Sequence, residues 1–286
     1  MRKQFELYHI KAFTTNPFEG NAAAVMFGDK LTENQMQQIA SKINYPETAF
    51  INASSEADFN LRWFSPSTEV ELCGHATIAA LHFLSEIGVF ESKDSITFET
   101  RSGKLKCFSF NAEYSIEMPV YSISELFADK DQIISAYKIP LDIIDIDTPV
   151  LTLSNNYVFI KIKSYDKLLS YKHDFDPKNS IVNKYPDISL YTTESIEANS
   201  AAHQRFFAPG SGIIEDAVTG SGAAYLAMVL LRTGSVTESM IQDSITIEQG
   251  DHLGKKGRIK VSFDKLNGLL VIKGNAVTFL KENIFI

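Results

Sequence analysis

The chain has 286 residues, of which 44% are hydrophobic and 22% charged, and its formal net charge is −8. This composition is typical of a globular protein with one large domain or two of ordinary size. The acidic balance excludes a surface built for polyanions, so we expect neither nucleic acid nor an anionic membrane as a partner.

Targeting signals and the number of cysteines indicate the cellular compartment in which the protein is expected. The N-terminus lacks the apolar core of a signal peptide, and no apolar run approaches the ~18 residues that span a bilayer. The two cysteines, Cys73 and Cys107, cannot form a disulfide framework. The sequence therefore predicts a reduced, cytoplasmic protein.

The predicted elements are mostly strands, with two unusual helices among them. Thr32 and Gln35 are the ends of a capping box, which predicts a surface helix from there to about Ile43. Segments rich in β-branched and aromatic residues predict strands; in chain order they read FINA, FNLRWF, ITFET, LKCFSF, YVFIKIK, ITIEQ, RIKVSF, LLVIKG and AVTFL. Helices over residues 76–84 and 223–231 are apolar nearly all round, which predicts that each is enclosed on every side.

The two halves of the chain repeat the same motifs in the same order. RWFSP at residues 62–66 recurs as RFFAP at 205–209, and the segment Gly74–Gly88 recurs as Gly220–Gly234. DSITFE then matches DSITIE, and GKLK matches GRIK. Each half therefore carries a strand, a turn, a glycine that opens an enclosed helix, and further strands. This predicts an α+β protein in which a curved sheet wraps round a central helix, built twice.

A domain boundary is predicted near Pro119, where an irregular polar stretch begins. We expect an N-terminal domain over residues 1–118 and a C-terminal domain over 119–275. The last strand, residues 276–286, is expected to return to the first domain. If the two domains pack about a pseudo-twofold axis, both helix starts point into one cleft between them.

Both central helices begin at a glycine, Gly74 or Gly220. The unpaired N–H groups and the partial positive charge of a helix N-terminus suit a carboxylate, and glycine lets a ligand approach the backbone. Polar candidates cluster at the same places: His75 follows the first glycine, and Asp216 and Ser221 flank the second. These positions predict a binding site for a small carboxylate-bearing molecule.

A further carboxylate, Glu47, follows Pro46 and leads into the apolar strand segment AFI. A carboxylate held in an apolar setting suits a general base that removes a proton from carbon. Glu47 is therefore the candidate catalytic residue.

The motifs NPFEGNAAAV, ETAFI, RWFSP with VELCGHATIAA, SGKL, RFFAP and EDAVTGSGAAYLA together resemble the PhzF-like phenazine-biosynthesis family. That family belongs to the diaminopimelate epimerase-like superfamily. The resemblance implies two pseudo-symmetric domains, each a barrel-like, mostly antiparallel sheet round a central helix, with the active site in the cleft between them. It also implies a homodimer and a cofactor-independent isomerase that moves a proton between carbons of a small, cyclic amino or hydroxy acid.

The family's site residues carry over motif by motif. Glu47 resembles the acid/base that removes a proton from carbon, while His75 and Asp216 resemble polar partners of the substrate's amino or hydroxyl group. The helix starts that hold the substrate carboxylate correspond to Gly74, Gly220 and Ser221.

Three departures from the family pattern leave the substrate open. Ala22 stands where a proline is usual, Ala217 interrupts the EDP motif, and Gly222-Ala223 replaces the usual Ala-His after TGS. None of them removes a candidate site residue.

The main alternative within the superfamily is a two-thiol epimerase or racemase. Cys73 precedes the first helix glycine, but the equivalent position before the second glycine is Thr219. A threonine hydroxyl cannot replace a second thiol base, so the repeat disfavours this mechanism and leaves Cys73 as a bystander that lines the cleft.

A second alternative is a non-catalytic ligand-binding or interaction protein that kept the fold, which the Glu47, His75 and Asp216 set disfavours. No cofactor is expected, because the glycine-rich run GSGIIEDAVTGSG matches neither a P-loop nor a dinucleotide fingerprint. No metal is expected either, because no second Cys/His pair lies at ligand spacing. Residues assigned to structural or surface roles by default are His9, His82, His173, His203, His252 and Cys107.

Overall fold

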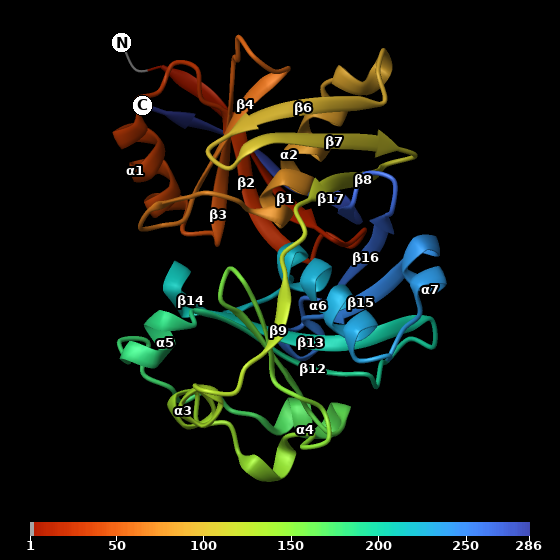
Figure 1. Ribbon diagram of the computed structural model, residues 1–286. Helices are drawn as coiled ribbons and strands as arrows, with labels where there is room; N and C mark the ends of the chain where they lie inside the picture. Colours follow the sequence, from red (N-terminus) through yellow and green to blue (C-terminus); the bar gives the residue numbers. More distant parts are fainter. Residues whose placement is uncertain (1–2) are drawn as a thin grey trace.

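In the computed structural model, which describes residues 3–286, two lobes lie one above the other (Figure 1). The first lobe holds most of the chain up to β8, together with the C-terminal strand, and the second lobe holds the rest. The two chain ends lie close together on the first lobe, where Lys3 and Ile286 exchange backbone hydrogen bonds. Among the described residues, no helix has the length and apolar character needed to cross a membrane.

The strands of the first half are β1 (Gln4–Ala12), β2 (Asn21–Phe27), β3 (Glu47–Asn52), β4 (Phe59–Phe64), β5 (Glu69–Val70), β6 (Ser95–Thr100), β7 (Gly103–Phe110) and β8 (Glu113–Met118). Those of the second half are β9 (Ile123–Glu125), β10 (Leu151–Leu153), β11 (Tyr157–Lys161), β12 (Asp187–Thr192), β13 (Ser200–Ala208), β14 (Ile213–Asp216), β15 (Ile245–Gln249), β16 (Gly257–Asp264) and β17 (Leu269–Phe285). The α-helices are α1 (Glu33–Ile43), α2 (Gly74–Glu86), α3 (Lys130–Ala136), α4 (Tyr165–Ser170), α5 (Ser180–Lys184), α6 (Gly220–Arg232) and α7 (Glu238–Asp243).

The first lobe is a closed barrel of eight strands. Its hydrogen-bonded order runs β1, β2, β3, β4, β6, β7, β8 and β17, and β17 returns to β1. The pairings β2–β3 and β4–β6 are parallel, and the others are antiparallel. Helix α2 contacts strands on every side of this ring, and ten of its 13 residues are buried. The all-round apolar pattern of this helix follows from its place inside the barrel.

The second lobe repeats this strand order but stays open. Its strands run β9, β10, β11, β12, β13, β15, β16 and β17, and β11–β12 and β13–β15 are again the parallel pairs. Helix α6 packs against β15, β16 and β17 and also touches α2. Within the described residues no pairing joins β9 to β17. The α+β class is therefore confirmed, whereas a closed ring of strands is present only in the first lobe.

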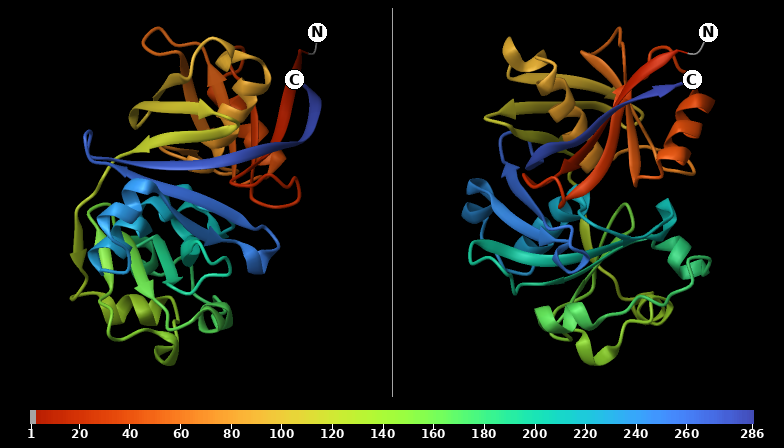
Figure 2. Two further views of the ribbon diagram at one scale, coloured as in Figure 1. Left: turned by 90° about the vertical axis from the view of Figure 1, so that its right-hand side faces the viewer. Right: turned by 180° about the vertical axis from the view of Figure 1, so that it is seen from behind.

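Strand β17 links the two lobes into one continuous sheet. Its first part, Leu269–Asn275, pairs with β16 of the second lobe and β8 of the first, and its remainder pairs with β1 (Figure 2). The predicted helix that starts after Thr32 is α1, and both members of the Thr32–Gln35 capping box form their hydrogen bonds.

Matching ion pairs brace the turns that lead into the two central helices. The Arg62 guanidinium makes two hydrogen bonds of 2.7 Å to Glu69, and Arg205 makes bonds of 2.7 and 2.8 Å to Glu215. The fork-like geometry fixes both partners more firmly than a single contact would. The repeated arginine of RWFSP and RFFAP therefore holds the same loop in each lobe.

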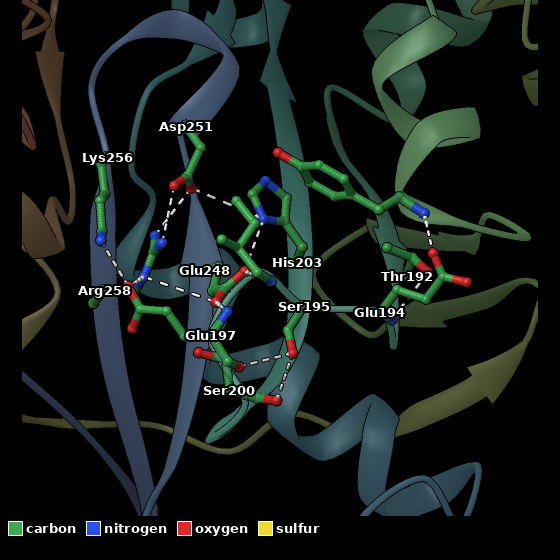
Figure 3. Close-up of polar contacts among 12 residues, drawn as sticks. Thr192, Glu194, Ser195, Glu197, Ser200, His203, Glu248, Asp251, Lys256 and Arg258 are labelled. Carbon is green, nitrogen blue, oxygen red and sulfur yellow. Dashed lines mark hydrogen bonds and ion pairs between the residues drawn. The ribbon is translucent and has the colours of Figure 1, made fainter.

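A buried carboxylate, Glu248 on β15, holds the chain between β12 and β13 in place (Figure 3). It accepts hydrogen bonds from the backbone N–H groups of Ile196 and Glu197 and contacts His203 Nδ1 at 3.1 Å. Burial alone would raise the pKa of Glu248, but the hydrogen bonds from His203 and from the two N–H groups outweigh burial and lower it to about 2.

Glu248→Gln is expected to destabilise the fold by about 3 kcal/mol at pH 7, because buried donors lose their charged acceptor. The pKa of the folded state, about 2, lies below the ordinary 4.5, so the ionised form stabilises the fold fully above pH 4.5. The difference between wild type and variant should then shrink as the pH falls toward 2. Urea unfolding from pH 3 to pH 7 measures this, with the exposed Glu56→Gln as control. An equal loss of unfolding free energy in Glu248→Gln and Glu56→Gln would contradict the prediction.

Candidate active site

The two central helices meet at their N-termini. A Cβ atom built on Gly74 would lie 3.5 Å from the Gly220 Cα and 3.7 Å from the Ser221 nitrogen. A Cβ on Gly220 would lie 2.9 Å from Ile272 Cδ1 and 3.0 Å from the Phe13 ring. Close packing therefore favours glycine at position 220, whereas a Cβ at position 74 would make ordinary van der Waals contact with the second helix start. The convergence of the helix starts that the repeat predicts is present in the structure.

Neither helix start is capped by its own side chain. The N-cap residues are Cys73 for α2 and Thr219 for α6, and neither side chain hydrogen-bonds to the first turn. The first N–H groups of both helices therefore keep their donor capacity, and two positive dipole ends lie side by side. Such a junction favours an anion.

A cavity of about 80 Å³ lies at this junction. Its walls come from both halves of the chain, and they include every candidate site residue of the sequence analysis. The lining residues are Glu47, Leu72, Cys73, Gly74, His75, Tyr157, Asp187, Phe206, Ala208, Ser211, Ile213, Asp216, Thr219, Gly220 and Ser221.

Glu47 and His75 form a buried pair on the wall contributed by the first lobe. Glu47 is the first residue of β3, and His75 is the second residue of α2. The His75 Nε2 atom lies 3.1 Å from Glu47 Oε2, and both side chains are under a tenth exposed. Apart from this contact, that oxygen has no hydrogen-bond partner among the described residues. The Glu47 carboxylate therefore lies in the cavity wall with the His75 imidazole as its one close polar partner among the described residues.

Asn21 ties the two lobes together behind this pair. Its amide nitrogen donates to Asp216 Oδ1 at 2.7 Å and to the Val218 carbonyl at 2.9 Å. The same nitrogen lies 3.3 Å from His75 Nδ1. An amide NH₂ group has two hydrogens, and the two shorter contacts use both of them. Asn21 therefore positions Asp216 and fixes how closely the imidazole approaches.

Asp216 is held from the second lobe by a chain of polar groups. The Thr219 hydroxyl donates to Asp216 Oδ2 at 2.6 Å, and Gln249 Nε2 contacts that hydroxyl and donates to the Asp216 carbonyl. Ser221 lies on the same side, with its hydroxyl 3.3 Å from the Tyr157 hydroxyl.

Burial and charge shift the titration of the cavity groups. Burial alone would lower the pKa of His75, but the Cys73 sulfur and the Glu47 carboxylate reverse this and raise it well above its ordinary value. Burial raises the pKa of Asp216, and the nearby Glu47 charge adds to the rise. Burial and the same charge raise the pKa of Cys73 to about 11. The thiol is therefore neutral near pH 7, which leaves the Glu47 carboxylate as the charge that favours a protonated His75 imidazole.

A metal could find three donors here. One ligand atom from each of Glu47, Cys73 and His75 lies within 4.8 Å of the others. Counting only cysteine and histidine, the sequence analysis missed Glu47 as a third donor. Three ligands with an open position is the donor count of a catalytic zinc site.

The structure adds residues to the site that the sequence analysis did not single out, namely Asn21, Tyr157, Asp187 and Gln249. Asn21 lies within the NPFEGNAAAV motif and could have been found there. Tyr157 and Asp187 lie in strands that carry no local motif, so only the sheet register brings them to the cavity. Gln249 directly follows the repeated DSITIE motif and contacts Asp216 behind the cavity wall.

The model of the phenazine biosynthesis-like protein family, PhzC-PhzF, matches residues 10–282 of this chain. The Bacillus subtilis isomerase YfhB, whose name describes it as uncharacterized, is 31% identical, with 93% of each chain covered. A phenazine biosynthesis-like domain-containing protein of Mus musculus is 34% identical, with 97% of this chain and 98% of the mouse protein covered.

Solved structures agree with this assignment. A phenazine biosynthesis protein of the PhzF family from Bacillus anthracis has a TM-score of 0.88 and 27% identity, covering 99% of this chain and all of that one. A hydroxyproline epimerase from Agrobacterium vitis has a TM-score of 0.62 at 12% identity over all of this chain and 94% of its own, which shows a shared fold. With a family model spanning nearly the whole chain and relatives above 30% identity, this protein belongs to the phenazine biosynthesis-like PhzC-PhzF family.

Proposed function

We propose that this protein is a cofactor-independent isomerase that moves a proton on a small, cyclic, carboxylate-bearing amino or hydroxy acid. The observation that carries the proposal is the buried Glu47–His75 pair beside two uncapped helix N-termini. That curated relatives of nearly equal length are named isomerases supports the reaction class.

The helix starts at Gly74 and Gly220 bind the substrate carboxylate through free N–H groups. Removing a proton from the adjacent carbon places negative charge on that carboxylate. The helix dipoles and the cationic His75 stabilise this developing charge, because they are fixed in a site with little water.

Glu47 takes the proton in this step. The C–H bond breaks, its electron pair stays on the substrate, and the carboxylate becomes a carboxylic acid. Return of a proton to carbon gives an isomer of unchanged composition. Asp216, kept in place by Asn21 and Thr219, binds the amino or hydroxyl group and so selects the carbon that reacts.

Glu47→Gln is expected to lower proton exchange at carbon by about 10² to 10⁴, because the glutamine amide cannot act as a base. To measure exchange, a panel of cyclic amino and hydroxy acids is incubated with the protein in deuterated water. Mass spectrometry then follows the incorporation of deuterium into each compound. Glu56→Gln, an exposed matched change, should keep the wild-type rate. Full exchange in Glu47→Gln would remove Glu47 from the mechanism, and tight binding without exchange across the panel would favour a non-catalytic ligand-binding protein.

Cys73 should be dispensable and poorly reactive. A pKa of about 11 against the ordinary 9.0 leaves about 100-fold less thiolate at pH 8, so alkylation by iodoacetamide should be slower by about that factor than in the unfolded chain. Glu47→Gln should speed the alkylation, because removing the neighbouring charge lowers the pKa of Cys73. Cys73→Ser should retain exchange; its loss would support the cysteine-dependent epimerase instead.

A further inference from the structure

Sheet register identifies the partner of Glu47 in the internal repeat. In the first lobe β3 runs antiparallel to β4, with Thr48 opposite Phe64. In the second lobe β12 runs antiparallel to β13, with Ile188 opposite Phe207. Phe64 and Phe207 are the same position of the repeated motif, RWFSP in one half and RFFAP in the other.

It follows that Thr48 corresponds to Ile188, and the residues just before them correspond too. Those residues are Glu47 and Asp187, each the first residue of its strand. The parallel neighbours agree, since Glu47 lies opposite Ala23 of β2 and Asp187 lies opposite Tyr157 of β11. The two lobes therefore each place a carboxyl at the head of the equivalent strand.

The parallel strands extend the correspondence to the asparagines. Asn21 lies two residues before Ala23, and Asn155 lies two residues before Tyr157. Asn21 is the hydrogen-bonding hub of the site, while the Asn155 Oδ1 atom is buried and has no partner among the described residues. The matched asparagines therefore support the register relation derived from the RWFSP and RFFAP motifs.

Both carboxyls reach the same cavity from different lobes. Glu47 lines it from the first lobe and Asp187 from the second. Asp187 is half-buried beside Tyr157 and Phe206, and within the described residues it forms neither an ion pair nor a hydrogen bond through its side chain. A carboxyl in a cavity wall with no protein partner is available to a ligand that enters the cavity.

We propose that Asp187 is a second catalytic acid/base of this site, acting on the substrate from the lobe opposite Glu47. This inference rests on the proposed isomerase function and gives that function its missing second group. Glu47 takes a proton from one face of the substrate, and Asp187 supplies a proton to the other.

The proton balance of this step is complete. The Glu47 carboxylate accepts the proton as the C–H bond breaks, and the electron pair is held on the substrate carboxylate. Protonated Asp187 then gives its proton to carbon, forming the new C–H bond and leaving its own carboxylate. The substrate and product have the same composition, and the two carboxyls regain their starting states by exchanging protons with water.

The titration of Asp187 suits this role. Burial raises the pKa of Asp187 to about 6, so that an appreciable fraction of the group is protonated near neutral pH. The titratable groups around it are Tyr157 of β11 and Tyr137, which directly follows α3. The shared cavity adds Glu47, Cys73, His75 and Asp216. An anionic substrate at the helix starts would raise this pKa further.

Stereochemistry and isotope content test the proposal in the intact protein. The panel compounds are incubated in deuterated water, and each product is separated by chiral chromatography and analysed by mass spectrometry. We expect the wild type to form product that carries solvent deuterium on the face opposite to the one that lost its proton. Asp187→Asn should slow that product by about 10² to 10⁴, Asp187→Glu should restore part of the rate, and the exposed Asp147→Asn should leave it unchanged. Product formation that Asp187→Asn leaves unchanged would overturn the proposal.

A second measurement needs no turnover. Isothermal titration calorimetry of benzoate, a planar carboxylate, at pH 7 in buffers of different ionisation enthalpy gives the protons taken up on binding. If the bound anion raises the pKa of Asp187 by about one unit, the wild type takes up about 0.4 proton at this group. Asp187→Asn should lose that uptake and Asp147→Asn should keep it.

The two measurements distinguish a failure of the proposed isomerase function from a failure of the role proposed for Asp187. No isotope exchange with any panel compound would sink the proposed isomerase, while the calorimetry would still decide whether Asp187 faces the bound carboxylate. Equal proton uptake in wild type and Asp187→Asn would overturn the role of Asp187 alone. If benzoate did not bind at all, the anion site and the inference built on it would both be wrong.

Discussion

The approach of two helix N-termini is the constraint on which the rest of this structure depends. Helices α2 and α6 meet at Gly74 and Gly220, and the side chain of Ile272 packs closely against both glycines. Two positive dipole ends that face each other repel, and their free N–H groups lack acceptors. Negative charge beside the junction offsets this repulsion, and the cavity carboxyls lie there; in the proposed function a substrate carboxylate adds to it.

The polar residues around the junction follow from this constraint. Asp216 brings negative charge to the second helix start, but a buried carboxyl needs donors, and Asn21 and Thr219 provide them. Because Asn21 comes from the first lobe and Asp216 from the second, the same hydrogen bond also fixes how the lobes sit. The position of Asp216 and the contact between the lobes therefore depend on the same hydrogen bond.

The sequence alone predicted much of this because the repeat is visible in motifs. The enclosed helices, the convergence of their glycines, and the meeting of Glu47 with His75 and Asp216 all follow from residues near a recognisable pattern. Asp187 could not be found in that way, since the strands ETAFIN and DISLYT share no identical residue. Their equivalence is carried by backbone pairing, which a single sequence does not encode locally. The open ring of the second lobe was equally hidden, because β9 has only three residues.

The two lobes differ at the N-caps of their central helices and agree at the first residues of β3 and β12. The N-cap positions have diverged to Cys73 and Thr219, and one is a neutral thiol while the other is tied to Asp216. The strand heads have instead kept a carboxyl in both lobes, Glu47 and Asp187. In the proposed mechanism, the two carboxyls at the strand starts transfer the proton, and the backbones of the two helix starts bind the anion.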